Sequence, residues 1–194
     1  KMVDRGKVMT AEELEAGKNF GRYLDVDGDG IPYRTYPGTH PTRGAFFTRG
    51  TTRNQYARYS EEGSVYVDNV ERLLKKFETA KSLVPAPETR KSAASTRTGV
   101  LYFGSTSGSM VEALELLERQ GIALNAMRLR GFPFSKEVDD FIAAHDRIYV
   151  VEQNRDAQLR TLLMTENHVD GSKLIPVLHF DGTPITARFI TQAI

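Results

Sequence analysis

The chain has 194 residues, 40% of them hydrophobic, and a formal net charge of +1 at pH 7. This balance predicts one or two folded domains, and it gives no overall attraction to nucleic acid or to a membrane surface. The lack of cysteine excludes disulfides, thiolate zinc sites, iron–sulfur ligation and cysteine nucleophiles within the chain, and it suits a cytoplasmic location.

Two helices are predicted in the first 83 residues. Thr10-x-x-Glu13 is a capping box, and it opens a short helix that Gly17 ends. From Val67 to Leu83, apolar residues recur at helical spacing, which predicts an amphipathic helix. Its apolar face holds Val67, Val70, Leu74 and Phe77. That face needs a partner, either the domain that follows or a neighbour outside the chain.

Between these helices, the motif Asp25-x-Asp-x-Asp-Gly30 matches the first half of a calcium-binding EF-hand loop. The alternating carboxylates of Asp25, Asp27 and Asp29 are ligands that Ca²⁺ or Mg²⁺ prefers. The twelfth loop position is Tyr36, where the motif requires a bidentate Glu. A divalent-metal site and an acidic surface turn therefore both remain open.

Residues 30–60 combine five arginines with six interleaved aromatic residues and contain no Asp or Glu. Tyr, Phe and Arg are enriched at subunit interfaces, and Arg also binds carboxylates bidentately. We expect irregular structure here, with a subunit interface as the first interpretation and a substrate clamp as the second. Base stacking is the third, and we expect no nucleic-acid partner. The candidate residues are Arg43, Arg49 and His40.

Four strand–helix units follow a Pro/Ala/Ser-rich linker over residues 84–97. The predicted strands are 100–103, 123–129, 148–151 and 174–180, with Pro176 indicating an edge position or a bulge in the last. The predicted helices begin at caps on Ser109, Ser135, Asn154 and Thr183. The alternation predicts an α/β fold with a mostly parallel sheet and helices on both faces. We therefore expect an arm and helix over 1–97 and an α/β domain over 98–194.

The turn Gly104–Ser109 lies between a strand and a helix, where backbone N–H groups can bind an anion. Ser105, Ser107 and Ser109 are the candidate residues, and a simple capping turn is the alternative. Glu152 ends the third strand, at the edge where α/β sheets place functional groups, and a rim residue paired with Asn154 is the plainer interpretation. No catalytic constellation of nucleophile and base is evident.

Three stretches resemble the alpha subunit of 2-oxoacid:ferredoxin oxidoreductases, most closely the 2-oxoglutarate type. The first is GRYLDVDGDGIPYRTYPG over residues 21–38, and the second is THPTRGAFFTRG over residues 39–50. The third is the α/β domain with Gly104–Gly108, Arg130–Phe134 and Val151–Asn154. The resemblance covers nearly the whole chain, and its first two motifs are the specific ones.

The resemblance implies the C-terminal portion of such an alpha subunit, with a transketolase C-terminal-like domain. The complex would decarboxylate a 2-oxoacid oxidatively, make an acyl-CoA and reduce ferredoxin. Its thiamine pyrophosphate, Mg²⁺ and iron–sulfur cluster would not be held by this chain alone. The implied partners are the beta subunit, the N-terminal remainder of the alpha subunit, ferredoxin and coenzyme A.

The resemblance carries no catalytic residue over to this chain, which begins with Lys1 rather than Met. We therefore expect a fragment or a processed product that is inactive by itself and serves subunit contact and site architecture. Two alternatives remain open. One is an independent α/β module that binds a nucleotide or a divalent metal, and the other is a structural interaction domain.

Overall fold

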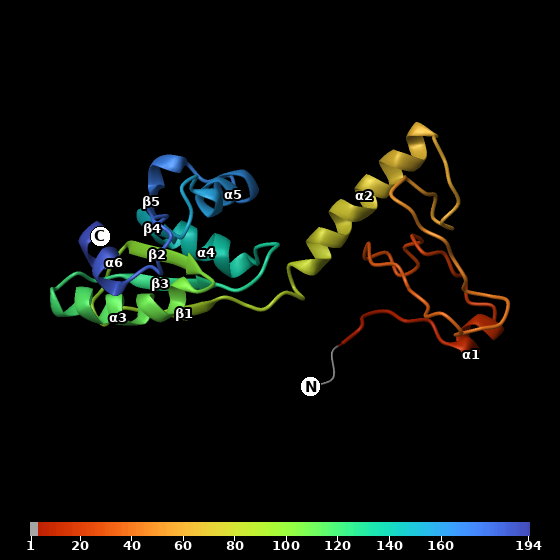
Figure 1. The fold of residues 1–194 in the computed structure, drawn as a ribbon, viewed down its shortest axis with the longest axis horizontal. Coiled ribbons are helices and arrows are strands. Elements are labelled where there is room, and N and C mark those ends of the chain that lie inside the picture. The colour runs from red at the N-terminus through yellow and green to blue at the C-terminus, as the bar shows by residue number, and fades with distance from the viewer. Residues whose placement is uncertain (1–3) are drawn as a thin grey trace. The chain divides into compact units, whose positions relative to one another are not determined.

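The structure, a computed structural model, describes residues 4–194. The chain folds as two compact units, Lys1–Ser82 (unit 1) and Leu83–Ile194 (unit 2) (Figure 1). The named strands all belong to unit 2. The strands and helices of this unit are, in chain order, β1 (Glu88–Arg90), β2 (Thr98–Phe103), α3 (Thr106–Arg119), β3 (Asn125–Leu129), α4 (Lys136–Ala144), β4 (Arg147–Glu152), α5 (Gln158–Glu166), the 3-10 helix η1 (Gly171–Lys173), β5 (Leu174–Leu178) and α6 (Ala187–Ala193).

The strands of unit 2 form one sheet in the order β1-β3-β2-β4-β5. β2 pairs in parallel with β3 and with β4, and β4 pairs in parallel with β5, whereas β1 runs antiparallel to β3. This confirms the predicted α/β fold with a mostly parallel sheet. Pro176 lies in β5 at the edge of the sheet, as a residue without an N–H donor requires.

Two apolar layers cover the two faces of the sheet, so the predicted placement of helices on both faces is confirmed. Successive residues of β2 alternate between them: Val100 and Tyr102 pack in one layer and Leu101 in the other. α3 and α6 supply the first layer, and α4 and α5 supply the second. The layers contain 13 and 12 buried residues.

Several boundaries of unit 2 differ from the sequence analysis. α5 begins at Gln158 with Ala157 at its N-cap, so the predicted cap at Asn154 is wrong by three residues. The segment predicted as linker supplies β1, whose three residues are all exposed and carry no apolar alternation. α3 begins at Thr106 rather than after Ser109, because the hydroxyl of Ser109 donates to the Ile185 carbonyl at 2.6 Å instead of capping. α6 begins after Thr186, since Thr183 is held in a turn by the carboxylate of Asp181.

Unit 1 contains α1 (Ala11–Glu15) and α2 (Gly63–Ala80), joined by a long irregular segment. The predicted capping box is present, because the Thr10 side chain accepts from the Glu13 N–H and the Glu13 carboxylate accepts from the Thr10 N–H. α2 begins four residues earlier than predicted. The buried hydrophobic residues among the described part of unit 1 are Met9, Leu14 and Ala57.

The apolar face of α2 is half-exposed. Val67 is 51% exposed, Val70 is 38% and Leu74 is 62%. The opposite contact of the helix is polar: the Arg72 guanidinium donates to the Gly30 carbonyl at 3.1 Å, and the Thr79 hydroxyl donates to the Asp29 carbonyl at 2.6 Å. α2 is therefore fixed to its own unit by hydrogen bonds to a turn rather than by its apolar stripe.

Candidate functional site

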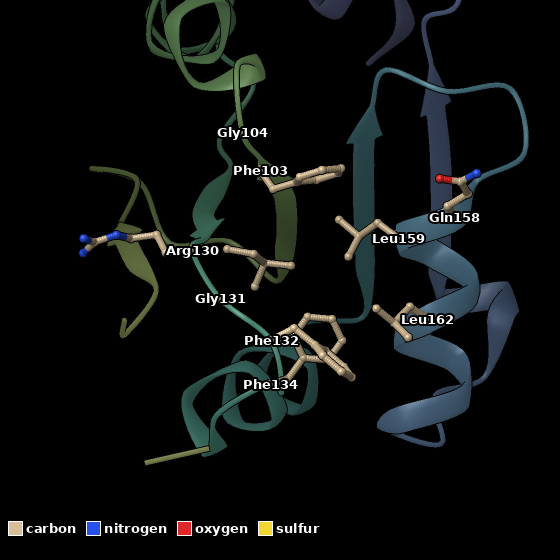
Figure 2. Close-up of a pocket in the computed structure, with 10 residues that line it drawn as sticks. Phe103, Gly104, Arg130, Gly131, Phe132, Phe134, Gln158, Leu159 and Leu162 are labelled. Carbon is tan, nitrogen blue, oxygen red and sulfur yellow. The ribbon is translucent and has the colours of Figure 1, made fainter. Parts of the chain in front are cut away.

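A pocket of about 470 Å³ opens at the carboxyl ends of β2 and β3, the edge where α/β sheets bind ligands. In Figure 2 the side chains of Phe103, Leu159 and Leu162 face a common space. Arg130 points away from it and pairs with Glu88 at 3.3 Å. The pocket is lined by Phe103, Gly104, Leu129, Arg130, Gly131, Phe132, Phe134, Gln158, Leu159 and Leu162. Its walls suit an apolar group and not an anion.

The carboxylate of Glu152 positions the helix that lines this pocket. Glu152 is 0% exposed at the end of β4. Its oxygens accept from the backbone N–H groups of Leu159 at 2.7 Å and Arg160 at 3.2 Å, and from the side-chain amide of Asn154 at 2.7 Å. A buried carboxylate is stable only with such partners. The sequence indicated the pairing with Asn154, but not the burial or the capping of α5.

The three serines of the predicted anion-binding turn do not converge on one point. Ser105 Oγ accepts from the Gln153 amide at 3.0 Å, and Ser107 donates to the Gly104 carbonyl at 3.0 Å. Ser109 is turned toward the loop before α6 and donates to the Ile185 carbonyl. Each hydroxyl therefore has a partner within the protein, and anion binding at this turn stays a prediction.

The aspartates of the turn Asp25–Gly30 pair with two lysines. Lys7 Nζ lies 2.7 Å from Asp27 Oδ2 and 2.6 Å from Asp29 Oδ2, and Lys75 lies 3.6 Å from Asp25. The hydrogen bonds from Lys7 hold the pKa of Asp27 and of Asp29 below the ordinary value of 3.8. Among residues 4–194, no group of three or more His, Cys, Asp or Glu side chains is arranged to hold a metal ion.

Two of the three residues proposed for the arginine-rich loop meet at the end of α1. His40 Nε2 donates to Glu15 at 2.5 Å, while its Nδ1 accepts from the Arg43 N–H at 2.9 Å. That donation holds the pKa of Glu15 below its ordinary value. Arg43 Nη1 donates to the Leu14 carbonyl at 2.7 Å and so caps the helix. His40 and Arg43 also line a pocket of about 380 Å³, whereas Arg49 is exposed elsewhere in the loop.

Three other arginines gather around Tyr23 and a neighbouring pocket. Arg22 and Arg72 lie over the Tyr23 ring, and Arg53 and Arg72 line the pocket beside it. The sequence did not single out this group, because its members come from three separate segments. Arg72 belongs to the mixed-charge face of its helix, together with Lys75 and Lys76, so no sequence signal marks it.

The side chains of the described residues do not fit an iron–sulfur cluster or a bound metal ion. The chain has no cysteine for an iron–sulfur cluster, and its described part presents no cluster of carboxylates and imidazoles for a metal. Within the described residues, no helix is both long enough and apolar enough to span a membrane.

No model of a known protein family matches the chain. Among solved structures, a 2-oxoglutarate:ferredoxin oxidoreductase from Magnetococcus marinus, with 2-oxoglutarate, coenzyme A and succinyl-CoA bound, is similar over 99% of this chain. The TM-score is 0.80 and the identity 21%, and the similarity covers 32% of that protein's chain. This chain thus spans about a third of the length of that relative.

Two further structures are similar over parts of the chain. A split-gene transketolase, an inactive beta4 tetramer, matches 55% of this chain and 39% of its own, at 17% identity and a TM-score of 0.44. The alpha chain of a probable 2-oxoacid ferredoxin oxidoreductase from Thermoplasma acidophilum matches 56% of this chain and 92% of its own, at 22% identity and a TM-score of 0.37. Both TM-scores are below 0.5.

The Magnetococcus marinus structure confirms the predicted resemblance at the level of the fold. The similarity extends over both units, including the arm that buries few apolar residues. An identity of 21% supports a shared fold and leaves activity, substrate and partners to be argued from this chain.

Proposed function

We propose that this chain is part of the alpha subunit of a 2-oxoacid:ferredoxin oxidoreductase of the 2-oxoglutarate type. The observation that carries the proposal is the similarity over 99% of the chain. A similarity confined to unit 2 would fit any α/β module. The similarity of unit 1 is more specific, because the described part of this irregular arm contains no sheet or helix bundle that unrelated proteins would reproduce.

Within such a complex, the residues of this chain form contacts with other subunits and part of the walls of the site. Unit 1 exposes aromatic side chains beside its arginines, including Phe47 at 68% and Tyr59 at 57% exposed. Such residues are typical of the buried centres of interfaces. Unit 2 supplies a rigid sheet with an apolar pocket at its carboxyl edge. The thiamine, Mg²⁺ and iron–sulfur chemistry belongs to the other parts of the complex in this proposal.

Neither alternative function gains support from a specific observation. A nucleotide-binding module needs a free phosphate turn, yet Ser105, Ser107 and Ser109 all have protein partners. A divalent-metal module needs open carboxylates, yet Lys7 lies between Asp27 and Asp29. A purely structural interaction domain differs from our proposal only in the partner, so the identity of the partner decides between them.

The proposal is tested by purifying the complex that forms on this chain and assaying it. We expect a beta partner that contains iron, and reduction of ferredoxin that depends on both 2-oxoglutarate and coenzyme A. The chain by itself should show no turnover. Turnover of 2-oxoglutarate by the isolated chain, or a complex that never reduces ferredoxin with any 2-oxoacid, would contradict the proposal.

A variant of Arg49 distinguishes, in the same assay, a role in the subunit interface from a role as a clamp for the substrate carboxylate. Arg49 is exposed, so Arg49→Ala leaves unit 1 folded, whereas Arg43→Ala removes a helix cap. Loss of assembly in Arg49→Ala would indicate an interface role. An intact complex with a raised KM for the 2-oxoacid would indicate a carboxylate clamp. Normal assembly and normal KM would exclude Arg49 from both roles.

A further inference from the structure

Unit 1 contains a cluster of three arginines, Arg22, Arg53 and Arg72, none of which forms an ion pair with the residues that the structure describes. Arg22 and Arg72 lie with their guanidinium carbons 5.7 and 5.8 Å from the centre of the Tyr23 ring. Arg53 and Arg72 line one pocket of about 350 Å³, which we call the arginine pocket. Its walls are Tyr23, Gly50, Thr51, Thr52, Arg53, Tyr66, Asn69, Val70, Arg72 and Leu73. No Asp or Glu is among them.

The guanidinium groups of this cluster are poorly satisfied. Neither Arg53 nor Arg72 forms an ion pair within residues 4–194, and the Nε atom of each is buried without a hydrogen-bond partner there. Arg72 Nη1 has one partner, the Gly30 carbonyl at 3.1 Å. The carboxylate of Asp25 is close enough to Arg72 to interact electrostatically, but its ion pair is with Lys75 and not with Arg72. Buried donors without acceptors are costly, so an occupant that supplies acceptors would be stabilising here.

The positive charges also disfavour one another. Burial, and then the nearby charge of Arg22, lower the pKa of Arg72 below its ordinary value. Like charges brought together without a counter-ion attract anions. The Thr51 and Thr52 hydroxyls in the wall of the pocket are further donors.

The loop that carries Arg53 is fixed relative to α2. The Asn69 side-chain amide donates to the Arg53 carbonyl and to the Val65 carbonyl. Arg53 forms an isolated bridge with Tyr59, and its guanidinium lies 5.8 Å from the Tyr59 and Phe47 ring centres. The donors are therefore held in place before a ligand arrives, which reduces the entropic cost of binding.

We propose that the arginine pocket binds the oxyanion group of a small organic acid, a carboxylate or a phosphate. Guanidinium groups recognise both through paired N–H···O bonds. The pocket volume is within the range of small-ligand sites, and Tyr66, Val70 and Leu73 offer an apolar surface for the rest of the molecule. This site is separate from Arg43 and Arg49, and it stands independently of the proposed enzyme complex.

The test is a titration of the whole chain, labelled with ¹⁵N, by inorganic phosphate and separately by glutarate, with sodium chloride at matched ionic strength as the reference. We expect saturable shifts at Thr51–Arg53 and at the Arg72 Nε–H signal. The tighter of the two probes identifies the source of the oxyanion as phosphate or carboxylate. Shifts that grow without saturation, or that match those in chloride alone, would overturn the proposal.

Matched variants make the test specific. Arg53→Gln removes a guanidinium that makes no hydrogen bond to the described residues, and losing one charge-assisted bond should weaken probe binding about tenfold, roughly 1.4 kcal/mol. Arg72→Lys retains the charge but loses the paired donors, so it should weaken binding as well. Arg58→Gln alters an exposed arginine of the same loop outside the pocket and should bind like the parent. Parent-like binding by Arg53→Gln would contradict the site.

Discussion

Unit 1 and unit 2 are stabilised by different kinds of contact. Unit 2 buries two layers of 13 and 12 residues on the faces of its sheet. The described part of unit 1 buries the hydrophobic residues Met9, Leu14 and Ala57 and relies on polar contacts such as those of Lys7, Arg43 and Arg72. Apolar burial scales with area, whereas exposed ion pairs contribute little. Unit 2 is thus a domain that folds through its core, and unit 1 is an arm suited to folding against a partner.

The largest expected effect is a cavity in the sheet core. Leu101 is 0% exposed in the central strand, and Leu101→Ala should reduce the free energy of unfolding of unit 2 by about 2–5 kcal/mol. Leu74 on α2 is 62% exposed, so Leu74→Ala should change the free energy of unfolding of the isolated chain by no more than about 0.5 kcal/mol. Urea denaturation followed by far-UV circular dichroism measures both. Equal changes in the free energy of unfolding would contradict the view that only unit 2 is stabilised by an apolar core.

The next effect concerns the turn that fixes α2. Gly28 and Gly30 both have positive φ, at 75° and 79°, where a side chain costs about 1–2 kcal/mol. A Cβ on Gly30 would lie 2.4 Å from the Lys76 backbone nitrogen, whereas one on Gly28 meets only the flexible end of Lys75 at 3.8 Å. Gly30→Ala should therefore destabilise unit 1 more than Gly28→Ala does.

Tyrosine fluorescence can follow these two variants, because six of the eight tyrosines belong to unit 1 and the chain has no tryptophan. We expect an earlier thermal transition for Gly30→Ala than for Gly28→Ala. Indistinguishable transitions would mean that the turn does not pack on α2 as described.

A smaller effect is expected at the buried cap of α5. Glu152→Gln replaces one acceptor oxygen by an amide, so one of the N–H groups of Leu159, Arg160 or Asn154 loses its partner. The loss should be about 1–3 kcal/mol in unit 2. Glu112→Gln, on an exposed position of α3, is the matched control and should be neutral. A neutral Glu152→Gln in urea denaturation would remove Glu152 from the account of how α5 is positioned.

The smallest effect is electrostatic and depends on pH. Since Asp27 and Asp29 titrate below 3.8 in the folded chain, their contribution is fully present above that pH and is lost as the pH falls through their folded pKa. In Lys7→Gln, the amide signals of Asp29 and Ile31 should titrate nearer 3.8 than in the parent. The measurement is an NMR titration from pH 6 to 2, and unchanged midpoints would contradict the contact with Lys7.

The sequence was sufficient to predict the sheet, because short apolar runs such as Val100–Phe103 and Ile148–Val151 alternate with capped helices. It could not predict β1, whose residues are all exposed. Nor could it predict that Lys7 closes the aspartate turn, since the two are about 20 residues apart and nothing in the pattern pairs them. The arginine pocket needed the fold for the same reason.

The capping of α5 by Glu152 could be predicted from the sequence only in part. Its position at the end of a strand indicated a special role, and its neighbour Asn154 was identified as a partner. Ala157, which precedes the helix, has a left-handed backbone with φ 51°. Alanine has no preference for this conformation, so the sequence does not predict the turn that places the helix N-terminus at the carboxylate.

Amide hydrogen exchange, measured on the chain alone and in its purified complex, tests whether unit 1 becomes ordered on a partner while unit 2 folds by itself. We expect slow exchange in β2 and β4 in both samples, and fast exchange over residues 38–59 that slows markedly in the complex. If residues 38–59 are equally protected in a chain shown to be monomeric, unit 1 is ordered without a partner and the account is wrong.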